Sequence, residues 1–123
     1  MSESVPNILV VEDEEHVRRL LLTLLKREGY VALAASDAGK ALDILDQAKI
    51  DLVLLDLHMP GPADGEDLLF LLRDRGDEVP IIIVSGWVDD EATTNQPDCV
   101  HAVLKKPIQI DKFVETVRQV LAL

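Results

Sequence analysis

The sequence contains a single cysteine, Cys99, and this scarcity limits the chemistry open to the protein. One thiol cannot form an intramolecular disulfide or a thiolate metal cluster, and no charged and then apolar signal peptide opens the chain. Long apolar runs are also missing: the longest, such as residues 81–84, have strand length, whereas a membrane helix needs about 20 apolar residues. These absences predict a soluble protein of a reduced, cytoplasmic compartment with no membrane partner.

Aromatic and basic residues are scarce as well. Aromatics make up 3% of the chain, so its 48% hydrophobic residues must build the core from Leu, Val, Ile and Ala, which suits helices packed on a parallel sheet. The 12 Lys and Arg stand against 23 Asp and Glu, for a net charge of -11. This field repels a phosphate backbone and no basic stripe offsets it, so we expect no direct binding of nucleic acid.

Short apolar runs alternate along the chain with segments of helical periodicity. A length of 123 residues suits a single domain over residues 1–123, with residues 1–6 as a loose N-terminal leader. The apolar runs predict strands at residues 7–11, 31–35, 51–57, 80–85 and 100–104.

The intervening segments have the apolar spacing of helices that bury one face. Gly29 is expected to end the first helix, and Ser36 or Asp37 to cap the second. The weak element is the fourth helix, because residues 89–96 contain only Ala92 as an apolar residue, so it should be short or mobile. Five strands joined by helical crossovers predict a three-layer α/β/α doubly wound fold with a five-stranded parallel sheet.

Polar residues follow the expected strands where a doubly wound sheet binds its ligands, beyond the carboxyl ends of the strands. They are Glu12 and Asp13 after the first strand, Asp56 and Ser85 at the ends of the third and fourth, and Lys106 after the fifth. Each alone has an ordinary explanation, such as a loop cap, an acidic helix start or a surface charge. Together they bring three carboxylates to one place.

Clustered carboxylates repel one another, so a proton or a positive charge must offset their negative charge. Two of them ~4 Å apart repel by about 4 kcal/mol at an effective dielectric near 20, which favours uptake of a proton or a cation. An all-oxygen, strongly negative site fits a hard cation such as Mg²⁺.

Four segments, in this order and at these strand ends, resemble the response-regulator receiver domain family of two-component signalling. They are ILVVEDE at 8–14, DLVLLDLHMPG at 51–61, PIIIVSG at 80–86 and KKP at 105–107. The resemblance covers nearly the whole chain and implies a flavodoxin-like fold. It also implies a phosphoprotein whose Asp56 accepts a phosphoryl group, with Mg²⁺, from a histidine kinase or phosphotransfer protein, and whose output face then switches.

The resemblance implies a role for each site residue. Glu12, Asp13 and Asp56 would supply metal ligands together with the backbone carbonyl of His58. Lys106 would pair with a phosphoryl oxygen, the Ser85 hydroxyl would hydrogen-bond the phosphoryl group, and the Lys106–Pro107 peptide would be cis. Such a domain is a signalling switch that catalyses only its own phosphorylation and dephosphorylation, and it can form a weak or phosphorylation-dependent homodimer.

The sequence departs from the family pattern in three places. Val103 occupies the position of the usual aromatic switch residue, and its stiff β-branched side chain puts a ring-rotation switch in doubt. Residues 59–65 form a loop one residue longer than the common form, which predicts a local bulge. Trp87, the only tryptophan, follows Ser85 by two residues and either covers the site or is simply exposed.

Two other functions remain open. A pseudo-receiver would keep the fold as an interaction module without phosphorylation, which the Val103 departure and the weak fourth helix leave possible. A phosphatase of the haloacid dehalogenase type also uses an Asp nucleophile and Mg²⁺, but it needs Asp-x-Asp after the first strand, where this chain has Glu12 and Asp13.

Overall fold

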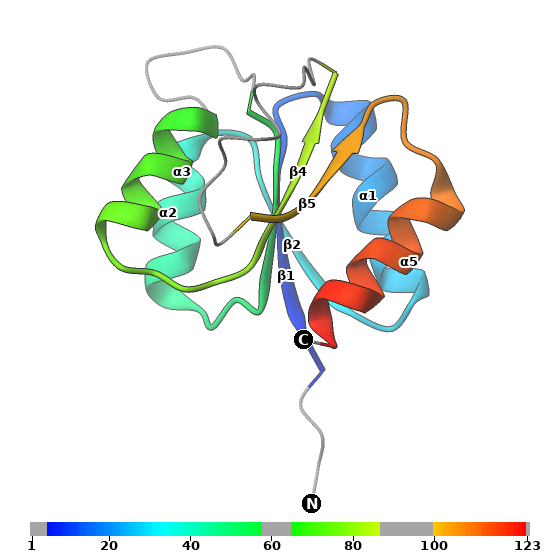
Figure 1. The fold of residues 1–123 in the computed structure, drawn as a ribbon, viewed down its shortest axis with the longest axis horizontal. Helices are drawn as coiled ribbons and strands as arrows, with labels where there is room; N and C mark the ends of the chain where they lie inside the picture. Colours follow the sequence, from blue (N-terminus) through cyan, green and yellow to red (C-terminus); the bar gives the residue numbers. More distant parts are fainter. Residues whose placement is uncertain (1–4, 58–64, 87–99, 123) are drawn as a thin grey trace, which may run out of the picture.

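The computed structural model describes residues 5–57, 65–86 and 100–122, and it has a central parallel sheet with helices on both faces (Figure 1). In chain order the elements are β1 (Asn7–Val11), α1 (Glu15–Arg27), β2 (Val31–Ala35), α2 (Ala38–Gln47), β3 (Leu52–Leu55), α3 (Gly65–Asp74), β4 (Ile81–Ser85), β5 (Val100–Lys105) and α5 (Ile110–Leu121). Helices α2 and α3 cover one face of the sheet, and α1 and α5 cover the other. The expected three-layer α/β/α fold is confirmed.

The strand order places the ends of β1 and β3 side by side. The order is β2-β1-β3-β4-β5 and all neighbouring strands are parallel. Because the chain runs from β1 out to β2 and then returns to the other side of β1, strand order reverses at this point. The crevice beyond the carboxyl ends of β1 and β3 is therefore where a doubly wound sheet binds ligands.

Alternation along the strands divides the apolar residues between two cores. In β1, Leu9 and Val11 pack toward α2 and α3, whereas Ile8 and Val10 pack toward α1 and α5. The same period of two runs through β3 and β4, whose residues are fully or almost fully buried. Burial on both faces explains why these strands are continuous apolar runs.

Local signals in the sequence correctly marked several helix ends. Gly29 follows α1 with φ +89° and donates its N–H to the Lys26 carbonyl, as expected of a glycine that ends a helix. Asp37 caps α2, since its side chain accepts the Lys40 N–H at 2.8 Å.

The third strand is shorter than the predicted 51–57, because it spans only Leu52–Leu55. At its start, the Asp51 side chain accepts the Asn7 N–H at 2.8 Å. At its end the chain leaves the sheet after Asp56, whose N–H still donates to the Val11 carbonyl at 3.0 Å. Backbone hydrogen bonds to β1 thus continue at both ends, where the Asp51 N–H also donates to the Asn7 carbonyl at 2.8 Å.

Other predictions fall on residues that the structure does not describe. The expected weak helix at residues 89–96, the long loop at 59–65 except its last residue, Cys99 and most of the leader lie outside the described ranges. The carbonyl of Pro6 accepts the Val31 N–H at 3.0 Å, so this residue contacts the sheet.

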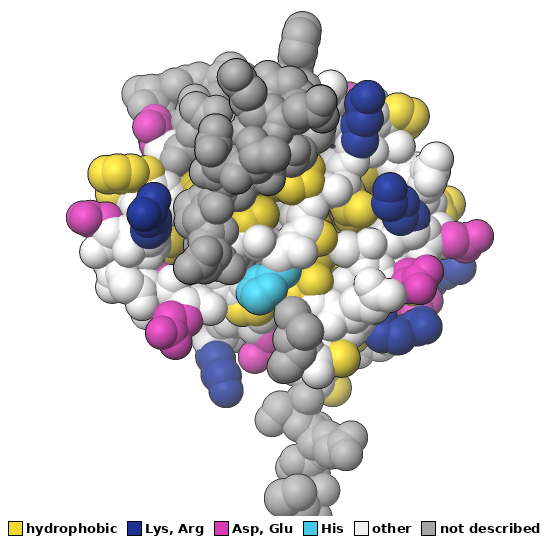
Figure 2. Space-filling view, viewed as in Figure 1, with side chains coloured by type: hydrophobic (Ala, Val, Ile, Leu, Met, Phe, Trp, Pro, Cys, Tyr) yellow, Lys and Arg dark blue, Asp and Glu magenta, His cyan; other side chains and the backbone are white. Residues whose placement is uncertain are grey.

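The surface of the described chain mixes charges of both signs. Figure 2 shows Lys and Arg side chains interspersed with Asp and Glu over the face it draws, without a basic stripe. None of the helices within the described ranges has the length and apolar character needed to cross a membrane.

Candidate functional site

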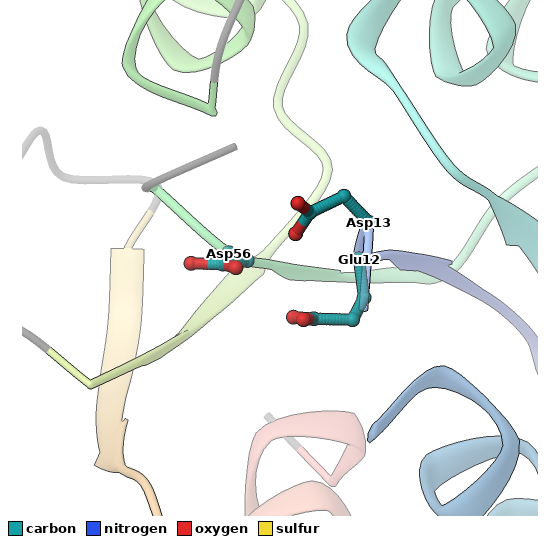
Figure 3. Close-up of side chains that lie close together, drawn as sticks. All are labelled: Glu12, Asp13 and Asp56. Carbon is teal, nitrogen blue, oxygen red and sulfur yellow. The ribbon is translucent and has the colours of Figure 1, made fainter. Parts of the chain in front are cut away.

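Three carboxylates meet beyond the ends of β1 and β3. The backbone sets their places, because the Glu12 N–H donates to the Ala35 carbonyl and the Asp56 N–H to the Val11 carbonyl, each at 3.0 Å. Glu12 and Asp56 are buried, with 1% and 4% exposed, and Asp13 reaches solvent. Each of the three offers an oxygen within 4.8 Å of the others, as Figure 3 illustrates.

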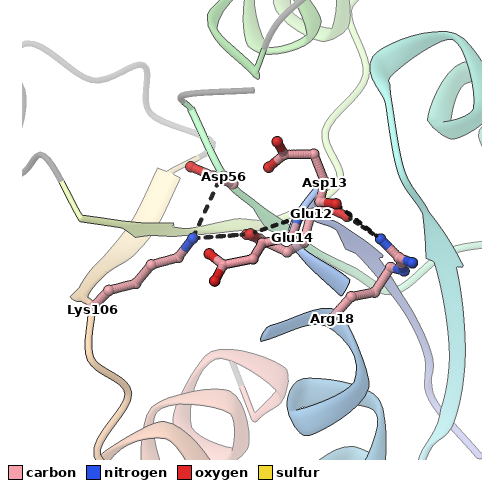
Figure 4. Close-up of polar contacts among 6 residues, drawn as sticks. All are labelled: Glu12, Asp13, Glu14, Arg18, Asp56 and Lys106. Atoms are coloured by element: carbon pink, nitrogen blue, oxygen red, sulfur yellow. Dashed lines mark hydrogen bonds and ion pairs between the residues drawn. The ribbon is translucent and has the colours of Figure 1, made fainter. Parts of the chain in front are cut away.

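Lys106 approaches the cluster from the end of β5. Its Nζ lies 3.0 Å and 3.2 Å from the two oxygens of Glu12 and 3.3 Å from Asp56 Oδ2 (Figure 4). The lysine backbone is held by β4, since its N–H donates to the Ser85 carbonyl at 3.0 Å, and the Lys106–Pro107 peptide is cis as expected. One ammonium thus contacts two buried carboxylates that come from different strands.

Burial and crowding change the acidity of this cluster. Desolvation raises the pKa of Glu12 to about 7, helped by the negative charge of Asp56 and opposed by the hydrogen bond from Lys106. For Lys106, burial alone would lower the pKa, but the hydrogen bond and charge of Glu12, with those of Asp56, outweigh it and raise the pKa. Burial thus disfavours the charged form of Glu12, whereas the neighbouring carboxylates favour the charged form of Lys106.

The other predicted site residues are only partly placed. Ser85 ends β4 and is 1% exposed, and the register that pairs Leu55 with Ile83 brings it to the same edge of the sheet as Asp56. His58 and Trp87 lie outside the described residues. Val103 is half-buried on β5 and packs against the core that α2 and α3 cover.

Arg18 belongs to this region although the sequence did not single it out. Its Nη1 donates to the carbonyls of Glu12 and Asp13, at 3.0 Å and 3.3 Å. No local pattern in the sequence separates Arg18 from the adjacent Arg19, which is also near the start of α1 but pairs with Glu15 on the surface.

Comparison with known proteins agrees with this geometry. The family model of the response regulator receiver domain matches residues 8–118. The chain belongs to this family. This receiver domain is 32% identical to an NtrX-like response regulator of Rickettsia bellii over 90% of the chain and 24% of that protein. It is 29% identical to the polar-differentiation response regulator DivK of Brucella anthropi, over 94% of the chain and 95% of DivK.

Solved structures share the fold of this receiver domain. A response regulator receiver protein from Pseudomonas putida superimposes with a TM-score of 0.87 at 33% identity, covering 96% of this chain and 99% of that one. The response regulator TrrA of Thermotoga maritima, in complex with Mg²⁺ and beryllofluoride, gives a TM-score of 0.82 at 27% identity, with 94% and 99% covered. The flavodoxin-like fold class is therefore confirmed.

Some relatives of the receiver domain are much longer than this chain. The chain spans about a quarter of the NtrX-like relatives, and 12% of the sensor kinase CckA of Brucella abortus, to which it is 33% identical over 93% of its own length. Receiver domains in this family thus occur both nearly alone and within larger proteins.

Proposed function

We propose that this receiver domain accepts a phosphoryl group on Asp56, with Mg²⁺, from the phosphohistidine of a histidine kinase or phosphotransfer protein. The observation that carries the proposal is the cluster of Glu12, Asp13 and Asp56, whose oxygens lie within 4.8 Å of one another with the Lys106 ammonium against two of them. Phosphorylation then switches the output face of the domain. The domain works as a switch in the cytoplasm and is not an enzyme with an external substrate.

The donor set fits Mg²⁺. Three carboxylate oxygens lie within 4.8 Å of one another, and oxygen ligands of this kind are the ones that Mg²⁺ prefers. Asp13 and Asp56 would bind the ion directly, Glu12 through water, and the carbonyl of His58 would complete the protein ligands. When bound, Mg²⁺ supplies charge neutralisation for the oxygens of the incoming phosphoryl group.

The chain's own residues perform the transfer. A carboxylate oxygen of Asp56 attacks phosphorus in line, so that an O–P bond forms while the N–P bond of phosphohistidine breaks and the imidazole leaves. Lys106 already contacts Asp56 Oδ2 and would pair with a phosphoryl oxygen, and the Ser85 hydroxyl would donate a hydrogen bond to another. Water later hydrolyses the acyl phosphate, which restores Asp56 and releases inorganic phosphate.

A comparison of labelling tests the proposal. Incubation with acetyl phosphate and Mg²⁺ should add one phosphoryl group to wild type and none to Asp56→Asn, as measured by intact mass. Asp74→Asn is the matched control, because Asp74 is an exposed aspartate on α3 that should not affect labelling. Undiminished labelling of Asp56→Asn would refute the assignment.

The alternative is a pseudo-receiver that binds partners without phosphorylation. The feature that favours it is Val103, which provides no aromatic ring for the usual switch. Wild type that neither takes a phosphoryl group nor binds beryllofluoride would support this alternative. The relatives named CckA and DivK suit a role beside histidine kinases in either case, and a weak homodimer is compatible with both.

A further inference from the structure

The Arg18 side chain makes two hydrogen bonds with the loop between β1 and α1. Its guanidinium Nη1 donates to the carbonyl of Glu12 at 3.0 Å and to that of Asp13 at 3.3 Å. Its backbone N–H donates to the carbonyl of Glu14 at 2.9 Å, which is the ordinary first hydrogen bond of α1 and does not depend on the side chain. The guanidinium itself therefore holds two consecutive carbonyl groups.

The sheet does not fix this part of the loop. The ladder between β1 and β2 continues as far as the Glu12 N–H, which donates to Ala35, and the chain then leaves the strand. A carbonyl in such a half-buried place needs a hydrogen-bond partner, and the Arg18 guanidinium donates to both carbonyls. These two bonds restrain the backbone from which the side chains of Glu12 and Asp13 project.

The contacts of Arg18 lie on the other side of the loop from those of Lys106 (Figure 4). Arg18 contacts backbone carbonyls, whereas Lys106 contacts carboxylate oxygens. The carboxylates of Glu12 and Asp13 therefore lie toward Asp56, whereas their backbone carbonyls accept hydrogen bonds from Arg18 on the opposite side of the loop. An arginine suits this task because its planar donors can serve two acceptors in fixed geometry.

The neighbouring Arg19 shows that this arrangement is specific. Arg19 pairs with Glu15 at 2.7 Å, one turn away on the helix surface, and its side chain is 73% exposed. Positive charge near the start of a helix is unfavourable with the helix dipole, and an exposed ion pair stabilises little. The two adjacent arginines thus differ in that one contacts the metal-ligand loop and the other faces solvent.

We propose that Arg18 is a positioning residue that preorganises the carboxylates of Glu12 and Asp13 for the cation. The inference rests on the proposed function, since it assigns Mg²⁺ to this cluster. Residues that hydrogen-bond to metal ligands without contacting the metal typically contribute about 10–100-fold to metal affinity.

Three variants test the role: Arg18→Met keeps the stem without donors, Arg18→Lys keeps the charge and a donor, and Arg19→Met is the matched control. Calorimetry gives the Mg²⁺ dissociation constant, and amide hydrogen exchange of metal-free protein gives the order of the loop at Glu14, whose N–H donates to Glu12 Oε1 at 3.3 Å. We expect Arg18→Met to weaken Mg²⁺ binding about tenfold or more and to speed Glu14 exchange about tenfold. Arg18→Lys should recover part of both effects, and Arg19→Met should change neither.

Each outcome separates this inference from the proposed function. Wild-type affinity and wild-type Glu14 exchange in Arg18→Met would overturn the inference, as would an equal weakening in Arg19→Met. If wild type itself binds no Mg²⁺, the proposed function fails, and the exchange comparison without metal still decides whether Arg18 orders the loop. If Arg18→Met does not fold, Arg18→Lys decides: reduced affinity with an unchanged melting temperature supports positioning, and unchanged affinity contradicts it.

Discussion

At the scale of single residues, the site is governed by the cost of burying charge. Glu12 is 1% exposed and lies beside Asp56, so its charged form is disfavoured even though Lys106 donates to both of its oxygens. The same arrangement stabilises the charged form of Lys106, because two carboxylates lie beside its ammonium. The proposed cation would add positive charge beside these buried carboxylates and favour their charged forms.

The raised pKa of Glu12 predicts how the stability of the domain depends on pH when no metal is added. The folded-state pKa of Glu12, about 7, lies above its ordinary value of 4.5, so the folded state binds the proton more tightly than the unfolded state. The resulting stabilisation is present below pH ~4.5 and is lost as pH rises through ~7, by an amount on the order of 1–3 kcal/mol. Glu12→Gln keeps a neutral side chain at every pH and should not show this loss.

The measurement is urea denaturation in EDTA at pH 5, 6, 7 and 8. The free energies of unfolding of wild type and Glu12→Gln should be similar near pH 5, and the variant should become the more stable protein by pH 8. Parallel pH profiles of the two proteins would contradict the raised pKa.

At the scale of elements, α3 shows how one helix divides into buried and exposed faces. Leu68 and Leu72 are 0% exposed and pack in the core beneath α2 and α3, whereas Leu71 is 38% exposed. Leu68 and Leu72 are four residues apart, which places them on the same face of the helix. The ends of elements were less predictable, as at β3, because side chains such as Asp51 compete with regular backbone pairing.

A matched pair of substitutions on α3 tests this division. Leu68→Ala should lower the free energy of unfolding by about 2–5 kcal/mol, because it leaves a cavity in a closely packed core. Leu71→Ala removes the same atoms from the surface of the same helix and should change it by less than about 1 kcal/mol. Chemical denaturation measures both, and similar losses in the two variants would mean that the helix face has been assigned wrongly.

At the scale of the whole molecule, the proposed cation would connect parts of the chain that are far apart in sequence. Asp13 follows β1 and Asp56 follows β3, so a ligand bound between them stabilises the folded sheet and finds no such site in the unfolded chain. Mg²⁺ at 100 times its dissociation constant should therefore add about 2.7 kcal/mol and raise the Tm.

The effect of Mg²⁺ on the Tm should depend on the site residues. Asp13→Asn removes one proposed ligand and should show a much smaller rise than wild type over the same Mg²⁺ titration. Asp43→Asn removes an equal charge from an exposed position of α2 and should keep the full rise. A rise in Asp13→Asn equal to that of wild type would remove Asp13 from the metal site.

Sequence patterns were enough to predict the alternation of strands and helices, the two-sided burial of the central strands and the residues at their carboxyl ends. These features are local, since periodicity, helix caps and strand-end polar residues depend on near neighbours along the chain. The family motifs then related Glu12, Asp13, Asp56, Ser85 and Lys106 to one site.

Only the tertiary structure decided how these residues act on one another. The order β2-β1-β3-β4-β5 brings Asp56 beside Glu12, and it lets Lys106 contact Glu12 across 94 residues of sequence. Burial raises the pKa of Glu12, and folding of α1 directs Arg18 onto two backbone carbonyls. Desolvation and hydrogen bonding depend on which atoms surround a group in space, and no local pattern along the chain contains that information.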